Sequence, residues 1–391
     1  MGEFPEHKLK DIGCTFLSGF GFKSSDYKRS GIPLIKIGNI QNRIVTIDPV
    51  GDFISEELID EKTSQFLLNN NDVLIAMTGQ GSVGRVGRLK LYNERRPLLN
   101  QRVGKFICDE INISIDFLYY ILTSEKYQDY LFSAGSGSGQ PNLSPDLILD
   151  TEIPYTDYKA QRIIASILSS LDDKIDLLHR QNKTLEALAE TLFRKWFVEE
   201  ADESWEEKSL VDIADYLNGL ALQKFPSNGF DDLPVIKIRE MKQGISENTY
   251  RCSKEIPSQY IIQDGDILFS WSGSLEVVIW NGGEGALNQH LFKVSSAKYP
   301  KWFYYLATKH HLPTFISIAE SKTTTMGHIQ REHLKQATIA IPQKEFFNQF
   351  DRTITPLIEK QIKNNYQIRT LTQLRDTLLP KLMSGEVRVK I

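Results

Sequence analysis

Two hydrophobic patterns alternate along the chain. Residues 1–157 and 199–343 contain short runs rich in valine, isoleucine, leucine and phenylalanine, interrupted by glycine, asparagine, aspartate and proline. Such runs are typical of β-strands joined by turns. In residues 158–198 and 344–391 the apolar residues recur at steps of three and four, which is the spacing of one helix face. The pattern therefore predicts two strand-rich modules, each followed by a long helix.

Each helical stretch carries a heptad seam. The first seam contains Leu168, Leu171, Ile175, Leu178, Asn182, Leu185, Ala189, Leu192 and Trp196, and the second contains Ile354, Leu357, Gln361, Asn364, Ile368, Leu371, Arg375, Leu378 and Leu382. A helix of about 35 residues is roughly 50 Å long at 1.5 Å per residue. Because both stripes belong to one chain and need burial, we expect them to pair with each other as an antiparallel coiled coil.

The polar residues in the seams allow two interpretations. Asn182, Gln361 and Asn364 lie near the middle, where polar side chains fix the register of a coiled coil at a cost in stability. The other interpretation is a loosely packed stretch that tolerates polar groups.

The two halves of the chain are similar to each other. Six segments of the first half, IPLIKIGNI, FLLNNNDVLIAMTGQGS, LLNQRVGKF, DFLYYILTS, TEIPY and TLEALAETLFRK, align with LPVIKIREM, YIIQDGDILFSWSGS, ALNQHLFKV, KWFYYLATK, ATIAIP and TLTQLRDTLLPK. The partners lie about 190 residues apart, several times the period of a solenoid repeat. We therefore predict a duplicated module with an internal pseudo-twofold relation. A duplication that only stabilises the fold remains the alternative.

Composition narrows the class of protein. With 391 residues, 41% hydrophobic and 25% charged, the chain has the balance of a soluble globular protein of two or three domains. No apolar stretch of 18 residues and no secretory signal occur, and the three cysteines are isolated, so we expect a cytoplasmic protein. The net charge of −4 argues against a protein that coats DNA by bulk attraction.

Local charge is uneven, and DNA contact would have to come from local patches. Seven basic residues stand against one acid, Glu94, between residues 79 and 106: Arg85, Arg88, Lys90, Arg95, Arg96, Arg102 and Lys105. Six acids lie between residues 199 and 207: Glu199, Glu200, Asp202, Glu203, Glu206 and Glu207. Such a run of like charge predicts a solvated connector at a domain boundary.

Two similar modules joined by paired helices suit the reading of two separated targets. Equivalent faces of duplex DNA recur every ~34 Å, so the modules would read two half-sites and leave the bases between them unread. A protein that measures another polymer would have the same pattern. An adaptor that holds proteins instead of DNA is also open, and apolar grooves on the modules would favour it.

The order of motifs resembles the target recognition domain of DNA specificity subunits from type I restriction-modification systems. The first copy has DVLIAMTGQGSVGR, LNQRV, SAGSGSGQPNLSPDLI and IPYTDYKAQRIIASILSSLDDKI, and the second has DILFSWSGS, LNQHL, ESKTTTMGHIQREHL and AIPQKEFFNQF. The terminal LLPKLMSGEVRV is also typical of that family, and the resemblance covers essentially the whole chain. The first copy departs in lacking Pro-Pro and Glu-Gln before the helix, where Tyr155 and Lys159-Ala160-Gln161 stand.

The resemblance implies an α+β protein with two tandem α/β target recognition domains and two long antiparallel helices. The expected division is 1–157 for the first domain, 158–198 for the central helix, 199–343 for the second domain and 344–391 for the last helix and tail. The family's role implies double-stranded DNA, two adenine methyltransferase subunits and two restriction/translocase subunits as partners. S-adenosylmethionine, ATP and Mg²⁺ are expected on those partners, with no cofactor and no metal in this chain.

Candidate DNA-binding residues come from the loops, because Arg and Lys suit guanine or phosphate and Asn and Gln suit adenine. In the first copy they are Lys36, Asn39, Gln41, Asn42, Arg43, Gln80, Ser82, Arg85, Ser136, Ser138, Gln140 and Asn142, and in the second Lys237, Arg239, Lys242, Trp271, Ser272, Ser274, Lys322, Thr323, Thr324, Thr325 and His328. A solvated loop is the alternative for each of them. The loops differ between the copies where the strands agree, which indicates unlike half-sites or drift.

No catalytic motif is convincing. Gly79-Gln80-Gly81-Ser82-Val83-Gly84 matches G-x-G-x-x-G, but the residues after it continue as strand, so we interpret it as a hairpin turn. A phosphate-binding loop and the Asn/Asp-Pro-Pro-aromatic motif of amino-methyltransferases are absent from the sequence. His310 and His311 lack partners at ligand spacing, and Glu240-Met241-Lys242 lacks the Pro-Asp of a metal nuclease. We therefore expect a non-catalytic subunit.

Overall fold

The computed structural model describes residues 4–92, 94–136, 141–321 and 327–390. The chain forms two compact units: unit 1 comprises Met1–Asp173 with Thr372–Ile391, and unit 2 comprises Lys174–Leu371. The two units divide the chain inside the two long helices. This division assigns part of each helix to each unit and therefore does not test the domain boundaries predicted from the sequence, which stay a prediction.

Unit 1 is built on mixed sheets in which most strand pairs are antiparallel. Its largest sheet has the strand order β2 (Cys14–Ser18), β11 (Val103–Cys108), β8 (Val73–Ala76), β9 (Val86–Leu89), β6 (Ile44–Val45) and β5 (Ile40–Gln41). A second sheet has the order β10 (Leu98–Leu99), β4 (Ile32–Ile35), β7 (Phe53–Ile54) and β3 (Tyr27–Lys28), and β1 (Glu6–Lys8) pairs with β12 (Glu152–Pro154). The pairs β4–β10 and β6–β9 are parallel. All four residues of β8 are buried, because this strand lies inside its sheet and packs on both faces.

Short α-helices complete the domain part of unit 1. They are α1 (Glu61–Ser64), α2 (Ile115–Leu122), α3 (Glu125–Gly135) and α4 (Pro145–Leu149). The side chains of α2 share a buried cluster with strands of the largest sheet, so that Phe117, Leu118 and Ile121 join Ile75 and Phe106 in one core.

Unit 2 repeats this plan. One sheet has the order β14 (Asp215–Asn218), β21 (Leu291–Ser295), β18 (Ile267–Ser270) and β19 (Glu276–Ile279), and another has β16 (Arg251–Ser253), β15 (Asp232–Ile236), β20 (Gly285–Leu287) and β17 (Ile261–Ile262). β13 (Glu206–Ser209) pairs with β22 (Thr338–Ile341) as β1 pairs with β12. The short helices are α6 (Leu210–Ile213), α7 (Ile238–Gln243), α8 (Lys301–His310), α9 (Leu312–Glu320) and α10 (Arg331–Gln336).

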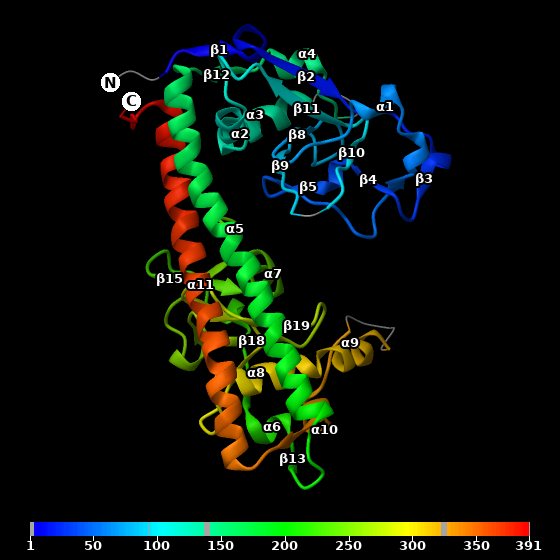
Figure 1. Ribbon diagram of the computed structural model, residues 1–391. Helices are drawn as coiled ribbons and strands as arrows, with labels where there is room; N and C mark the ends of the chain where they lie inside the picture. The colour runs from blue at the N-terminus through cyan, green and yellow to red at the C-terminus, as the bar shows by residue number, and fades with distance from the viewer. Residues whose placement is uncertain (1–3, 93, 137–140, 322–326, 391) are drawn as a thin grey trace. The chain divides into compact units, whose positions relative to one another are not determined.

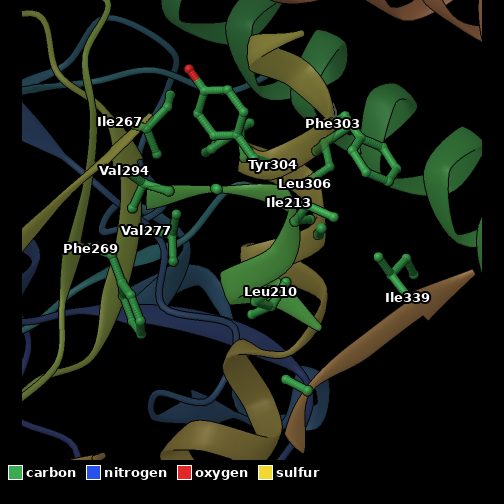
Figure 2. Close-up of a cluster of buried hydrophobic side chains, with 14 of the residues drawn as sticks. Leu210, Ile213, Ile267, Phe269, Val277, Val294, Phe303, Tyr304, Leu306 and Ile339 are labelled. Carbon is green, nitrogen blue, oxygen red and sulfur yellow. The ribbon is translucent and has the colours of Figure 1, made fainter. Parts of the chain in front are cut away.

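The core of unit 2 lies between the first of these sheets and α6 and α8. Figure 2 shows the side chains that fill it: Ile267 and Phe269 of β18, Val277 of β19, Val294 of β21, Leu210 and Ile213 of α6, and Phe303, Tyr304 and Leu306 of α8, with Ile339 of β22. These side chains are all buried, and their burial is the main favourable free energy available to this half of the fold.

Two long helices carry the predicted seams. α5 spans Tyr158–Arg194 and α11 spans Lys344–Ser384, and the two lie side by side (Figure 1). Within unit 2 the pairing is antiparallel, because Asn182 contacts Asn364 while Trp196, just beyond α5, stacks on Phe350 with ring centroids 4.4 Å apart. Every residue of the two predicted seams is buried or half-buried. The predicted helix pair is thus confirmed.

Unit 1 contains the corresponding pairing at the other ends of the helices. Leu168 of α5 shares a buried cluster with Leu379 and Leu382 of α11, and Arg375 Nη1 lies 2.8 Å from Asp172 Oδ1. None of the helices in the described ranges has the length and apolar character needed to cross a membrane.

Candidate nucleic-acid interface

Three segments of unit 1 meet where β8 ends, and we call them the first turn cluster: residues 77–82, 100–102 and 142–143. The backbone N–H of Met77 donates to the carbonyl of Arg102 at 2.9 Å. The N–H of Leu143 donates to the carbonyl of Met77 at 2.8 Å. These bonds join the turn after β8, the turn before β11 and the segment before α4 into one assembly.

Unit 2 contains a second turn cluster of the same construction, made of residues 271–274, 288–290 and 327–329. The N–H of Trp271 points to the carbonyl of His290 at 3.4 Å, and the N–H of Ile329 donates to the carbonyl of Trp271 at 3.0 Å. Isolated bridges link Thr78 to Asn142 in unit 1 and Ser272 to His328 in unit 2. The segments that are repeated in the sequence therefore form equivalent backbone contacts in the two units.

The asparagine of each Leu-Asn-Gln motif fixes the turn from inside. Asn100 and Asn288 are only 6% and 3% exposed. Their Oδ1 atoms accept from the backbone N–H of Arg102 at 3.2 Å and of His290 at 3.3 Å. The motif's asparagine is thus a structural residue, and the residue two positions later, Arg102 or His290, is exposed in both units.

A glycine in each unit allows the neighbouring strand to approach this turn. A Cβ built on Gly19 would lie 2.2 Å from the carbonyl oxygen of Asn100, and one on Gly219 would lie 2.2 Å from that of Asn288. Both distances are below any van der Waals contact, so the two turns require glycine at these positions.

The second turn cluster presents aromatic and polar groups together. The Nε1–H of Trp271 donates to Asn218 Oδ1 at 2.9 Å, and its ring centroid lies 5.8 Å from that of His290 and 6.4 Å from that of His328. The buried Ser272 hydroxyl lies 3.0 Å from His290 Nδ1. Three residues predicted from the sequence, Trp271, Ser272 and His328, are therefore brought together.

The first turn cluster offers different side chains on the same frame. Arg102, Gln80 and Asn142 are exposed, and Ser82 is half-buried. The Oγ1 of Thr78 is buried and forms no hydrogen bond with any residue that the structure describes. An arginine and an asparagine here occupy the positions of two histidines in unit 2.

Most of the basic run between residues 85 and 105 is used inside unit 1. Its ion pairs are Arg88 with Asp116 at 2.9 Å, Lys90 with Asp173 at 3.1 Å, Arg95 with Glu56, and Lys105 with Asp72 at 2.8 Å, and Arg96 donates to the carbonyls of Leu67 and Leu68. Arg85 and Arg102 have no such acidic partner among the described residues. Fewer cationic side chains of this run are therefore available for DNA than the sequence indicates.

Four first-copy candidates line a groove elsewhere in unit 1. Gln41, Asn42, Arg43 and Arg85 belong to its lining, together with Asp376 of α11, and its volume is about 970 Å³. Asn42 and Arg43 form the two-residue turn between β5 and β6, with φ of 51° and 68°. Arg43 Nη1 lies 3.5 Å from Asp376 Oδ1. Arg43 therefore links the hairpin to α11, and none of the four candidates is part of the first turn cluster.

Three further first-copy candidates are committed to local structure. The Nζ of Lys36 contacts Asp52 and lies 4.4 Å from the centre of the Tyr27 ring. Asn39 accepts from the Lys36 N–H at 2.8 Å and donates to the carbonyl of Thr46 at 2.9 Å, so it closes its own turn. The exposed Ser136 donates its hydroxyl to the carbonyl of Phe132.

Lys237, Arg239 and Lys242, the basic candidates that the structure describes in unit 2, lie on or beside α7. Lys237 and Arg239 are exposed, and Lys237 Nζ lies 5.4 Å from the ring centre of Tyr250. Lys242 Nζ donates to Ser274 Oγ at 2.5 Å, which connects α7 to the second turn cluster. The carboxylate of Glu240 is buried and accepts from the N–H of Lys237 at 3.1 Å, so it caps α7.

Six of the predicted residues, Ser138, Gln140, Lys322, Thr323, Thr324 and Thr325, lie outside the described residues. Arg102, His290 and Asn218 were not among the individual DNA-binding residues predicted from the sequence, although Arg102 belongs to the basic run. Arg102 and His290 both follow the Asn-Gln pair of a repeated motif, and comparison of the two motifs is the signal that would have found them.

The adjacent histidines lie at the C-terminal end of α8, where His310 is exposed and His311 is half-buried. Burial lowers the pKa of both His310 and His311 from the ordinary value. His311 Nε2 donates to the carbonyl of Thr338 at 3.0 Å. In the described part of the chain no three histidine, cysteine, aspartate or glutamate side chains are grouped to hold a metal ion.

Comparison with known proteins identifies relatives along the whole chain. A family model described as type I restriction modification DNA specificity domain matches residues 1–187 and 202–366. The chain is 26% identical to the type I restriction enzyme MjaIX specificity subunit of Methanocaldococcus jannaschii, covering 100% of this chain and 96% of that protein. It is also 26% identical to the EcoKI specificity subunit of Escherichia coli, covering 95% and 87%.

A solved structure has a similar fold. The S subunit of a type I restriction-modification system from M. genitalium matches with a TM-score of 0.60 and 16% sequence identity, covering 97% of this chain and 96% of that one. This similarity agrees with the predicted fold of two tandem domains and two long helices.

Proposed function

The chain belongs to the type I restriction modification DNA specificity family, and from that membership we propose that it reads a bipartite, asymmetric DNA site and positions adenine methyltransferase subunits there. Each domain reads one half-site. The observation that carries this proposal is the pair of turn clusters, which share one backbone frame and carry different side chains. A common frame suits a common docking mode, and unlike side chains suit unlike bases.

The mechanism that we propose is positional. Phosphate contacts from basic side chains orient each domain on the duplex, and the turn clusters contact base edges in the major groove. The paired helices set the number of bases between the half-sites. In this proposal two methyltransferase subunits carry out methyl transfer, and restriction/translocase subunits join the complex for cleavage.

The chemistry belongs to those partners in this proposal. S-adenosylmethionine would bind the methyltransferase subunits, and ATP and Mg²⁺ would serve the translocase subunits. The chain itself would act on DNA in the cytoplasm without performing a covalent step.

Long-read methylation mapping of the host genome, with and without the gene for this chain, tests the proposal. We expect a split motif with two specified halves to lose its adenine methylation when the gene is deleted and to regain it when the gene is restored. A methylome that does not change on deletion would instead support an adaptor that joins proteins without DNA specificity.

A domain-specific variant sharpens the test. Replacing residues 79–85 changes the turn after β8 in unit 1 only, so we expect one half of the motif to change and the other to stay. If both halves changed together, the assignment of one half-site to each domain would be wrong.

A further inference from the structure

Arg102 and His290 occupy the same position in the two domains. Each is the last residue of an Asn-Gln-X turn, and each follows a buried asparagine that accepts from its backbone N–H. We propose that this position reads a base, that Arg102 selects a guanine in one half-site, and that His290 gives the other half-site a different preference. The inference rests on the proposed function and adds to it the residues that decide sequence.

The backbone of Arg102 is held from three directions. Its N–H is bound by Asn100, its carbonyl accepts from Met77, and the N–H of the preceding Gln101 donates to the carbonyl of Phe20 at 3.0 Å. A base-reading side chain needs such a frame, because a specific hydrogen bond loses its selectivity when its support moves by about 1 Å.

Charge also distinguishes Arg102 from its neighbours. Arg88, Lys90, Arg95 and Lys105 are each paired with an acid of unit 1, whereas the exposed Arg102 has no acidic partner among the described residues. An exposed guanidinium on a rigid turn can form the two parallel hydrogen bonds that match O6 and N7 of guanine.

The groups around Arg102 suit a base edge better than a phosphate alone. Asn142 and Gln80 are exposed in the same cluster, and both side chains can donate and accept. The buried Thr78 Oγ1 has no partner among the described residues, whereas the equivalent Ser272 hydroxyl lies 3.0 Å from His290 Nδ1. A buried hydroxyl without a partner is unfavourable, so a ligand group or water that reaches it would relieve that cost.

His290 cannot reproduce the arginine contact. Its Nδ1 is engaged by Ser272, and its Nε2 has a long contact of 3.4 Å with the side-chain amide of Gln289. A base that displaced this amide would receive one hydrogen bond from the ring. The Trp271 ring beside it adds an apolar surface of the kind that contacts the thymine methyl group. At this position the second domain therefore offers one imidazole nitrogen beside the apolar ring of Trp271, whereas the first domain offers a guanidinium that can donate two parallel hydrogen bonds.

The experiment uses the complete chain with its partner subunits in the host, and methylation of all genomic adenines is mapped by long-read sequencing. Arg102→Gln should lower methylation of the parent motif roughly 10-fold or more and relax one guanine position towards adenine, because glutamine pairs with adenine. His290→Ala should relax one position in the other half-site only.

Arg95→Gln is the matched control, because it removes the same charge from an exposed arginine of the same segment that pairs with Glu56. We expect its motif to equal that of the parent. Equal, sequence-independent loss in Arg102→Gln and Arg95→Gln would mean a general charge effect and would overturn the inference, as would an Arg102→Gln motif identical to that of the parent.

Failure of the inference and failure of the proposed function are distinguishable. If the deletion strain loses a split motif while Arg102→Gln changes neither half, the function stands and this inference falls. If deletion changes no motif, the function itself falls. Arg102→Ala, with thermal unfolding compared against the parent, serves as the second variant should the glutamine affect folding.

Discussion

Lys105 of β11 and Asp72, the residue before β8, form an ion pair in unit 1 with Nζ and Oδ2 2.8 Å apart. Lys293 and Asp266 form the same pair at 2.8 Å in unit 2. All four side chains are at most a quarter exposed. In each unit this ion pair joins the two neighbouring strands that lead to the turn cluster, β8 and β11 in unit 1 and β18 and β21 in unit 2. The duplicated module therefore repeats the ion pair as well as the strands.

Loss of this ion pair should destabilise the unit that contains it. Lys105→Met leaves the Asp72 carboxylate partly buried without its cation, and we expect a loss of about 2 to 4 kcal/mol in the free energy of unfolding, with a similar loss for Lys293→Met. Denaturant titration measures both. Lys126→Met is the control, because that lysine is 72% exposed in its pair with Glu6 and should change stability by less than about 1 kcal/mol. An equal effect of all three would contradict the prediction.

The glycines beneath the turns should be intolerant of a side chain. Gly19→Ala and Gly219→Ala each place a methyl group 2.2 Å from a backbone oxygen, so the strand must shift, and we expect a loss of about 1 to 3 kcal/mol. Gly38→Ala is the control, because nothing lies within 4 Å of its Cβ position. Thermal unfolding of the three variants checks this, and a stable Gly19→Ala would argue against the close approach.

Much of this architecture was predictable from the sequence, because it depends on periodicity. The heptad steps in residues 158–198 and 344–391 follow directly from the burial of one helix face, and the seams are buried as expected. The alignment of LNQRV with LNQHL likewise placed equivalent turns in the two halves.

The site itself was predicted only in part, because tertiary contacts decide which polar residues remain available. In the sequence Lys90 belongs to a basic run, but in the fold it is paired with Asp173, which lies 83 residues later. Lys36 and Asn39 resembled base contacts, but local partners occupy them. Conversely, the motif did not indicate that Asn100 is buried and that the following Arg102 is exposed.

The polar layer between the long helices should be cooperative. Asn364 Nδ2 donates to Asn182 Oδ1 at 2.9 Å, and Asn182 donates to Asn365 Oδ1 at 2.6 Å. Asn364→Leu alone removes the donor from a buried acceptor, and we expect a loss of about 1 to 3 kcal/mol. The double variant Asn182→Leu, Asn364→Leu should recover most of this loss, because an apolar pair leaves fewer polar groups buried without partners. A double-mutant cycle by denaturant unfolding measures the coupling, and additive losses would show that the two residues act separately.

Acid should remove one stabilising contribution in unit 1. Backbone N–H donors of Asn112 and Ile111 hold the pKa of Asp109 down to about 2, below the ordinary value of about 3.9. A depressed pKa in the folded state stabilises at pH values above the unfolded pKa, and that contribution disappears as the pH falls from about 4 through 2. Asp109→Asn should therefore be less stable than the parent at pH 7, and the difference should narrow below pH 4. Thermal unfolding of both proteins at pH 7, 5, 4 and 3 tests this, and a constant difference would mean that ionisation of Asp109 is not its cause.

The length of the paired helices should set the unread gap. Seven residues inserted into α5 between 172 and 192, matched by seven in the facing part of α11 between 354 and 375, keep the heptad seams in register. A heptad adds roughly 10 Å at 1.5 Å per residue, which equals about three base pairs at 3.4 Å each. Methylome mapping should then show the same two half-sites separated by about three more unspecified bases.

A control insertion separates helix length from chain length. Seven residues placed between Asp202 and Glu203, in the exposed acidic connector, add the same number of residues between the modules but leave α5 and α11 as they are. We expect this variant to keep the parent gap, because a connector that does not pair cannot set a distance. A gap that grew with the connector, or that failed to grow with the helices, would show that the seam packing does not measure the DNA.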